Sequence, residues 1–241
     1  MIQLVHAKLP DVPHHLACDE VLLELCDSGE LGATLRFWSS DRSCVVLGLG
    51  NDLDREVDLE ACRVEGVPVF RRCTGGGAVV QGRGCLNYSL VLPLSESHEL
   101  ANVLSANAFI MERNRAAVSA ALGCSVEVCG CTDLALNGLK FSGNAQRRRR
   151  SALLFHGTFL LEFDLPSVSR LLHLPVRQPK YREGRKHEAF LMNLKLPEEQ
   201  ISAEVSAAWK AVDSDLKVSV EEVRERASKW ASDPRWRCFA G

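Results

Sequence analysis

The stretch "VPVFRRCTGGGAVVQGRGCLNYSLVLPL", residues 67–94, places three consecutive glycines among apolar segments of strand length. Short apolar runs bounded by glycine are typical of buried strands. We therefore predict strands over 67–72, 78–81 and 85–94, with "TGGG" as a tight turn. Each glycine gives up the most backbone freedom of any residue on folding. A glycine-rich turn of this kind lets a ligand approach the backbone closely.

Outward from this stretch, strand-like segments mostly follow one another through turns, and Asn137-Gly138 is a strong hairpin signal. Few of them are separated by the long crossovers that a parallel sheet needs. The pattern predicts an α/β fold of the α+β type, with a central mixed, largely antiparallel sheet flanked by helices. We expect strands at 34–39, 43–50, 125–130, 133–138, 139–146 and 151–163, and helices at 14–29, 59–66, 98–122, 164–173, 186–194, 197–212 and 219–232.

Composition restricts the class of protein. The chain has 241 residues, 46% of them hydrophobic and 25% charged, with a net charge of −2. This balance does not favour binding to nucleic acid or to a membrane surface. No apolar segment is long enough for a membrane helix, and no export signal is visible at the N-terminus. The ten cysteines are irregularly spaced, so we interpret them as reduced thiols of a cytoplasmic protein.

The glycine turn carries the first candidate for chemistry. Its N–H groups can form a site for an anion, and Arg71 and Arg72 precede it. The sequence matches neither a P-loop nor a dinucleotide-binding fingerprint. Taken alone, a flexible hairpin with solvated arginines is an equally good interpretation.

Three further features come later in the chain. Lys140 follows the hairpin turn and could stabilise a phosphate or a developing oxyanion, although a lone lysine is more often simply exposed. His156, Gly157 and Thr158 interrupt an apolar strand, which indicates either a ligand site or a core histidine. Arg147–Arg150 predicts a solvated loop, with an acidic partner protein or nucleic acid as alternatives.

Three motifs in order, "RRCTGGGAV", "CLNYSL" and "NGLKFSGNAQ" followed by "FHGT", closely resemble the lipoate-protein ligase A family. The similarity covers most of the chain, including "HLACDEVLLE" and "LRFWSSDRSCVVLGLGN". The resemblance implies the catalytic-domain fold of biotin and lipoate protein ligases. It also implies that ATP and Mg²⁺ convert lipoate or octanoate to an acyl-adenylate. A lysine of a lipoyl domain, in a 2-oxoacid dehydrogenase or a glycine-cleavage-type carrier protein, then accepts the acyl group.

The resemblance also assigns residues. Lys140 is the expected catalytic residue, and the apolar strands around Val79, Leu90 and Phe155 would suit the lipoate tail. No residue is assigned to a metal. The residues expected to bind the nucleotide and the acyl-adenylate are Arg72, Thr74, Gly75, Gly76, Gly77, Ala78, Val79, Val80, Asn87, Ser142, Gly143, His156, Gly157 and Thr158.

The chain departs from the family pattern after the glycine turn. Many members have His-Asp where this chain has Gln81-Gly82, and Gly-Asn where it has Gly84-Cys85. We also expect one catalytic domain over 1–241, with a helical C-terminal segment from about 197 and no full accessory domain. Ligation would then call for a separate accessory protein or follow a different course.

Two other reactions or roles remain open. One is octanoyl transfer from acyl carrier protein through a cysteine thioester, for which Cys129 or Cys131 is the candidate nucleophile. Buried strand thiols are the alternative interpretation of both cysteines. The other is a non-catalytic module that kept the fold and binds a lipoyl domain, for which the altered Gln81, Gly82 and Cys85 are the best support.

Overall fold

Two long strands with alternating residues form the centre of the structure, a computed structural model that describes residues 1–232 and 237–239. Strand β6 (Cys85–Pro93) pairs antiparallel with β10 (Ala152–Leu160), so that Leu90 lies opposite Phe155. Because side chains alternate along a strand, neighbouring residues of this pair face opposite sides of the sheet.

The larger sheet has eight strands in the order β11-β1-β2-β6-β10-β9-β8-β7, and most of its pairs are antiparallel. Its fold class therefore agrees with the sequence prediction. The Asn137-Gly138 turn joins β8 to β9, as predicted. The remaining strands of this sheet are β1 (Ile2–Val5), β2 (Thr34–Trp38), β7 (Glu127–Cys129), β8 (Asp133–Leu136), β9 (Leu139–Arg148) and β11 (Ala211–Asp213).

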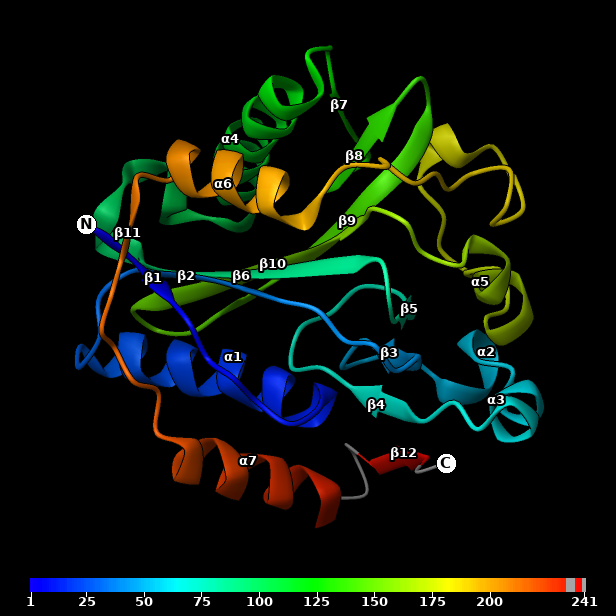
Figure 1. The fold of residues 1–241 in the computed structure, drawn as a ribbon, viewed down its shortest axis with the longest axis horizontal. Coiled ribbons are helices and arrows are strands. Elements are labelled where there is room, and N and C mark those ends of the chain that lie inside the picture. Colours follow the sequence, from blue (N-terminus) through cyan, green and yellow to red (C-terminus); the bar gives the residue numbers. More distant parts are fainter. Residues whose placement is uncertain (233–236, 240–241) are drawn as a thin grey trace.

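Helices cover both faces of this sheet (Figure 1). Helices α4 (Val103–Leu122) and α6 (Glu198–Ala208) pack on one face and enclose an apolar core. On the opposite face lies α1 (Val12–Ser28), with α7 (Val220–Ser232) packed against it. Asp11 caps the start of α1 through the His14 amide, and Gly29 ends it in a left-handed conformation.

A smaller sheet in the order β12-β4-β3-β5 lies beside the larger one (Figure 1). The glycine turn joins β4 to β5, but these two strands do not pair with each other, since both pair with β3. The turn therefore crosses over β3, and the hairpin interpretation is wrong. The elements of this part are β3 (Cys44–Leu47), β4 (Val69–Arg71), β5 (Val79–Gln81), β12 (Arg237–Phe239), α2 (Leu53–Glu56), α3 (Leu59–Glu65) and α5 (Leu165–Leu171).

Two helix predictions need correction. Residues 186–194 form no helix. A single turn closes at His187, and the chain then runs beside the start of β9, where Lys140 bonds to Phe190 and Met192 through the main chain. The predicted helix 197–212 ends at Ala208, and its last residues enter β11. The C-terminal segment is therefore partly strand, and 233–236 and 240–241 lie outside the described residues. Short 3-10 helices lie at Leu94–Glu96, His98–Ala101 and Lys180–Arg182.

Within residues 1–232 and 237–239, no helix is both long and apolar enough to cross a bilayer.

Candidate functional site

The glycine triplet forms a loop that presses against the end of β3. The Thr74 carbonyl accepts a hydrogen bond from the Leu49 amide. A Cβ added to Gly48 would lie 2.0 Å from the Gly76 carbonyl oxygen, and Gly76 itself has a φ of +87°. Both glycines are therefore required by close backbone contact and by left-handed geometry. We call residues 73–78 the glycine loop.

Arg72 holds the glycine loop in shape from inside. Its Nε donates to Thr74 Oγ1 at 3.0 Å, and its Nη2 donates to the carbonyls of Gly75 and Gly77 at 2.6 and 2.9 Å. Its Nη1 donates to the Val46 carbonyl at 3.1 Å. Burial lowers the pKa of Arg72 to about 10. All these donors are used within the protein, so the structure gives Arg72 a loop-shaping role. Its predicted contact with phosphate stays a prediction.

On its outer side, the glycine loop binds a carboxylate group of the protein itself. Glu56, at the end of α2, takes a hydrogen bond from the Ala78 amide at 2.6 Å through Oε2. Its other oxygen accepts from the side chain of Asn51. A carboxylate oxygen on a loop amide is a stand-in for the oxygen of a phosphate or of another anion. This part of the loop therefore fits the anionic group that ATP would bring.

Lys140 is held at the start of β9 by an acid. Its Nζ lies 2.7 Å from Asp133 Oδ1, and Tyr181 donates to Asp133 Oδ2 at 2.8 Å. A Cβ on Gly143 would lie 2.8 Å from the Lys140 Nζ. Gly143 is therefore the residue that lets the lysine lie across the strand. Of the Lys140 side chain, 26% is exposed, so the lysine is only partly enclosed.

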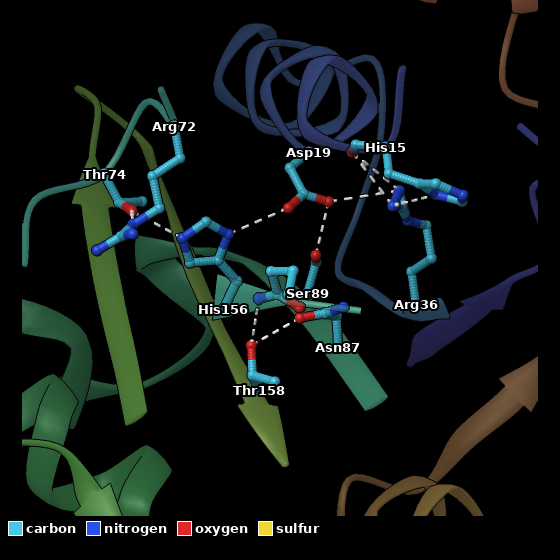
Figure 2. Close-up of polar contacts among 10 residues, drawn as sticks. His15, Asp19, Arg36, Arg72, Thr74, Asn87, Ser89, His156 and Thr158 are labelled. Atoms are coloured by element: carbon cyan, nitrogen blue, oxygen red, sulfur yellow. Dashed lines mark hydrogen bonds and ion pairs between the residues drawn. The ribbon is translucent and has the colours of Figure 1, made fainter. Parts of the chain in front are cut away.

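A row of polar side chains runs from the glycine loop to α1 (Figure 2). Thr74 Oγ1 lies 2.7 Å from Nε2 of His156, and the Nδ1 of His156 lies 3.1 Å from Asp19 Oδ2. A carboxylate can only accept, so in the neutral ring Nδ1 carries the proton and Nε2 accepts from the threonine hydroxyl. We call Thr74, His156 and Asp19 the polar row.

Two further groups hold Asp19 next to His156 (Figure 2). Ser89 donates to its Oδ1 at 2.6 Å, and Arg36 lies 3.4 Å away. Burial works to raise the pKa of Asp19, but the charge of Arg36 and the hydrogen bonds from His156 and Ser89 hold it below its ordinary value. Asp19 is therefore a buried anion at neutral pH.

Asn87 and Thr158 lie opposite each other two residues further along the same pair of strands, on the same face as His156. Thr158 donates to Asn87 Oδ1 at 2.6 Å and accepts from the side-chain amide of Gln81 at 2.8 Å. Gln81, one of the departures from the family pattern, thus takes part in the site through Thr158. The free ends of both amides, Gln81 Oε1 and Asn87 Nδ2, are buried without a partner.

The structure separates some predicted site residues from the rest. A Cβ on Gly157 would lie 1.7 Å from Asn144 Oδ1, so that side of Gly157 is filled by a side chain. Ser142 is buried and bonds to the same asparagine. Val79 and Val80 lie in β5, where Val80 is buried beneath the smaller sheet. Binding by these residues stays a prediction.

Leu90 and Phe155 do not line a site for an acyl chain. Both are fully buried in the core under α4 and α6, on the face of the larger sheet that points away from α1. The expectation that they surround the lipoate tail is therefore wrong, because alternation along β6 and β10 turns them to the other side.

Cys129 and Cys131 lie at the turn between β7 and β8. Cys131 is exposed, and Cys129 is only partly buried, so the interpretation of both as buried thiols is wrong. Burial, with the nearby charges of Glu127 and Asp133, raises the pKa of Cys129. A thiol that attacks as a thiolate needs the opposite shift.

The first three residues of the arginine run, 147–149, are not solvated, whereas Arg150 is exposed in a bend. Arg147 pairs with Glu20 of α1 at 2.9 Å and also donates to the Cys73 carbonyl of the glycine loop at 3.4 Å. Arg149 pairs with Glu24, and α7 adds Arg226 to the same two acids. These arginines tie β9 to α1 and α7, which is why the solvated-loop prediction fails.

Sequence reasoning missed four residues of the site: Asp19, Glu56, Asp133 and Tyr181. Asp19 carried a signal, since an acid between Leu16 and Leu22 lies in the apolar part of a helix. Asp133 could have been found from the hairpin register, which pairs it with Gly143. Glu56 and Tyr181 gave no signal, because their contacts depend on segments far apart in the sequence.

Comparison with solved structures identifies the fold. The chain superposes on the bipartite lipoate protein ligase of Thermoplasma acidophilum with a TM-score of 0.78 and 23% identity, over 98% of this chain and 95% of that one. It is equally similar to a lipoate-protein ligase A crystallised with ATP, with a TM-score of 0.77 and 23% identity over 98% and 97% of the two chains. The architecture is thus that of lipoate-protein ligases.

The model of the lipoyl protein ligase A/B catalytic domain matches residues 11–208, so the chain belongs to this family. It is 36% identical to a lipoate-protein ligase A of Aeropyrum pernix over 162 residues, which are 66% of this chain and 58% of that protein. It is 28% identical to the octanoyltransferase LipM of Oceanobacillus iheyensis, over 91% of this chain and 87% of that protein. These relatives carry names for two different reactions.

Proposed function

We propose that this protein is an ATP-dependent lipoate-protein ligase. In this proposal it activates lipoate or octanoate as an acyl-adenylate with Mg²⁺. It then transfers the acyl group to a lysine of a lipoyl domain, in a 2-oxoacid dehydrogenase or a glycine-cleavage-type carrier protein. The family assignment and the fold support lipoylation chemistry of the ligase or octanoyltransferase type.

The position of Lys140 relative to the glycine loop favours a ligase over a transferase. The Lys140 ammonium lies over Gly143, while the Cβ position of Gly76 in the glycine loop is 3.8 Å from the Cβ of Ala145, further along β9. A cation and a loop whose amide already binds a carboxylate oxygen thus share one side of the same strand. Positive charge and backbone donors are what a developing acyl-phosphate needs.

In the adenylation step, ATP supplies the phosphoanhydride that the acid's carboxylate attacks. The amides of the glycine loop would hold phosphate oxygens in place of Glu56. Lys140 would release Asp133 and stabilise the negative charge between the carbonyl and the phosphate. No group of three His, Cys, Asp or Glu residues that could hold a metal occurs in the described part of the chain. Mg²⁺ would therefore be held mainly by the phosphates, as is usual for this ion.

Octanoyl transfer through a cysteine thioester is the second candidate. The match to a LipM over 91% of this chain favours it. The raised pKa of Cys129 argues against this thiol as the nucleophile.

An ATP–pyrophosphate exchange assay with lipoate, octanoate and biotin, each tested separately, distinguishes the two candidates. Exchange with lipoate or octanoate, and none with biotin, is the result expected of a ligase. The matching assay offers octanoyl-acyl carrier protein and an apo lipoyl domain without ATP. Transfer in that assay, together with no exchange for any acid, would overturn the ligase proposal in favour of the transferase.

A further inference from the structure

A line of buried polar side chains crosses the mostly apolar face of the larger sheet, on the side of α4 and α6. The indole N–H of Trp209 donates to Asn114 Oδ1 at 2.8 Å, and Asn114 Nδ2 donates to the Tyr88 hydroxyl at 2.7 Å. Tyr88 donates in turn to Asn144 Oδ1 at 2.6 Å. Burial raises the pKa of Tyr88, so its hydroxyl keeps the proton that it donates. The line therefore ends at Asn144 on β9, and each of its side chains is hydrogen-bonded.

Gly157 allows this line to reach β9. It lies opposite Tyr88 on β6 and opposite Asn144 on β9, in the register of the three neighbouring strands. A Cβ on Gly157 would lie 1.7 Å from Asn144 Oδ1, so a glycine is needed for Tyr88 and Asn144 to meet across β10. The glycine that interrupts this apolar strand is thus explained by a contact within the protein, and that contact fixes the orientation of the Asn144 amide.

The other end of the Asn144 amide holds the turn that leads into β8. Its Nδ2 donates to the Thr132 carbonyl at 2.7 Å, and the Thr132 hydroxyl donates back to the Asn144 carbonyl at 2.7 Å. We call these two reciprocal hydrogen bonds the asparagine clamp. Because each of them uses a side chain, they add to the main-chain bonds of the sheet and fix the start of β8 against β9.

The asparagine clamp flanks the ion pair of Lys140. Asp133, directly after Thr132, lies opposite Gly143 in the register of β8 and β9. Gly143 in turn directly precedes Asn144. Lys140 Nζ lies 2.7 Å from Asp133 Oδ1, and a Cβ on Gly143 would lie 2.8 Å from the same nitrogen. The lysine nitrogen therefore rests on two residues whose direct neighbours in the sequence form the clamp.

A bulge in this hairpin gives Lys140 its direction. The register of β8 and β9 shifts where Lys140 lies opposite Ala135, so that Phe141 is the extra residue on β9. An extra residue of this kind changes the face to which the side chains on one side of it point. Lys140 therefore extends over Gly143, whereas strict alternation would place it on the face of Asn144.

A cation stabilises a developing charge only when it points at the reacting atoms, and a displacement of about 1 Å can lower the rate about 100-fold. The bulge interrupts the regular ladder beside Lys140. We propose that Asn144 and Thr132 are positioning residues, which fix β8 against β9 around the bulge and so set the direction of the Lys140 ammonium. The inference deepens the proposed function, because it rests on Lys140 as the group that stabilises charge in the adenylation step.

The matched pair Thr132→Val and Thr132→Ser tests the clamp at a partly buried position. Valine has the shape of threonine but no hydroxyl, so one clamp bond is lost, whereas serine keeps this bond. With the full chain, we expect Thr132→Val to lower kcat for ATP–pyrophosphate exchange with lipoate by about 10-fold, while KM for ATP and for lipoate changes by less than about twofold. Thr132→Ser should restore most of the rate.

Asn144→Ala removes the other clamp bond and should lower kcat by about 100-fold. It also takes the acceptor from the Tyr88 hydroxyl, so urea unfolding is used to check that the variant is folded. Gln146→Leu is the matched control. Gln146 lies two residues further along β9 on the same face, but its side chain donates to the Val103 carbonyl and to Asn107 of α4. Its exchange rate should stay near that of the unaltered protein.

A double variant distinguishes positioning of Lys140 from general damage to the structure. If the clamp acts through Lys140, adding Thr132→Val to Lys140→Ala should lower exchange by no more than about twofold further. A further loss of about 10-fold in that background would overturn the inference, because the clamp would then act without the lysine. Equal kcat values for Thr132→Val and the unaltered protein would overturn it as well.

A second measurement does not depend on turnover. Trace amounts of labelled acetic anhydride acetylate lysine amines, and peptide mass spectrometry compares Lys140 with the exposed Lys217 in the same sample. A looser pair with Asp133 should raise the relative acetylation of Lys140 in Thr132→Val by about threefold. If the unaltered protein shows no exchange with any acid, the proposed function fails, and this measurement still decides on the clamp. Unchanged relative acetylation in Thr132→Val would reject the clamp.

Discussion

The two faces of the β6–β10 pair differ completely, although alternating residues of the same two strands form them. On the side of α4 and α6, Leu90 and Phe155 lie opposite each other with no exposed surface. One residue further along each strand, Ser89 lies opposite His156 and faces α1. The first face contributes packing, and the second carries buried charges and hydrogen bonds. The comparison teaches that stability and chemistry in this protein are separated by a single step along a strand.

The largest loss of activity should follow a substitution on the polar side of the sheet that leaves the fold intact. Lys140→Ala removes the cation from the site, and we expect acyl-adenylate formation to fall by about 10³-fold. The free energy of unfolding should change by about 1 kcal/mol or less, because the ion pair with Asp133 is partly solvated. Pyrophosphate exchange and urea unfolding measure the two quantities. Normal lipoyl-AMP formation would show that Lys140 is not catalytic.

The apolar face should give the reverse result. Leu90→Ala leaves a cavity in the core and should lower the free energy of unfolding by about 2–5 kcal/mol. At a temperature where the variant is folded, its exchange rate should remain within about threefold of normal, since Leu90 points away from the site. Chemical denaturation and the exchange assay check this. A large loss of activity in the folded variant would break the separation of the two faces.

The buried charges of the polar face should make stability depend on pH. Burial and then Arg36 lower the pKa of His15 from 6.5 to about 4. The unfolded chain therefore binds a proton at His15 between these values that the folded chain does not bind. The contribution of His15 to the free energy of unfolding is fully present above about pH 6.5. It is lost as the pH falls toward 4, by roughly 3 kcal/mol in all.

His15→Gln removes this titration, so we expect a flatter dependence of the unfolding free energy on pH between 4 and 7. Urea unfolding at several pH values measures the slope. The exposed His98→Gln protein serves as the control and should keep the slope of the unaltered protein. Equal slopes for His15→Gln and the unaltered chain would mean that His15 is not held neutral by its buried position.

The smallest effect is expected outside both faces. The double variant Cys129→Ser, Cys131→Ser changes two thiols at the turn between β7 and β8, and a ligase should retain its acyl transfer within about twofold. Complete loss of transfer in the folded double variant would favour the thioester route instead. Transfer to an apo lipoyl domain, followed by mass spectrometry, is the measurement.

Local chemistry made much of the fold predictable. The helix over 12–28 was anticipated from its apolar pattern, and the hairpin before β9 from Asn137-Gly138. The helix expected at 186–194 was wrong because its backbone bonds go to Lys140, far back in the sequence. The arginine run was misjudged for the same reason, since its partners Glu20 and Glu24 lie on the first helix.

By itself, the sequence determined the family, the glycine turn and the mixed sheet, because motifs and alternation act over short distances. The tertiary structure alone decided three other matters. It turned Leu90 and Phe155 into core, because the register of β6 and β10 sets which side each residue faces. It directed the Arg72 guanidinium to the carbonyls of the glycine loop, since buried hydrogen-bond donors need partners within the protein. It also brought Thr74, His156 and Asp19 into one row. These residues lie far apart in the sequence, so local patterns could not predict their contact.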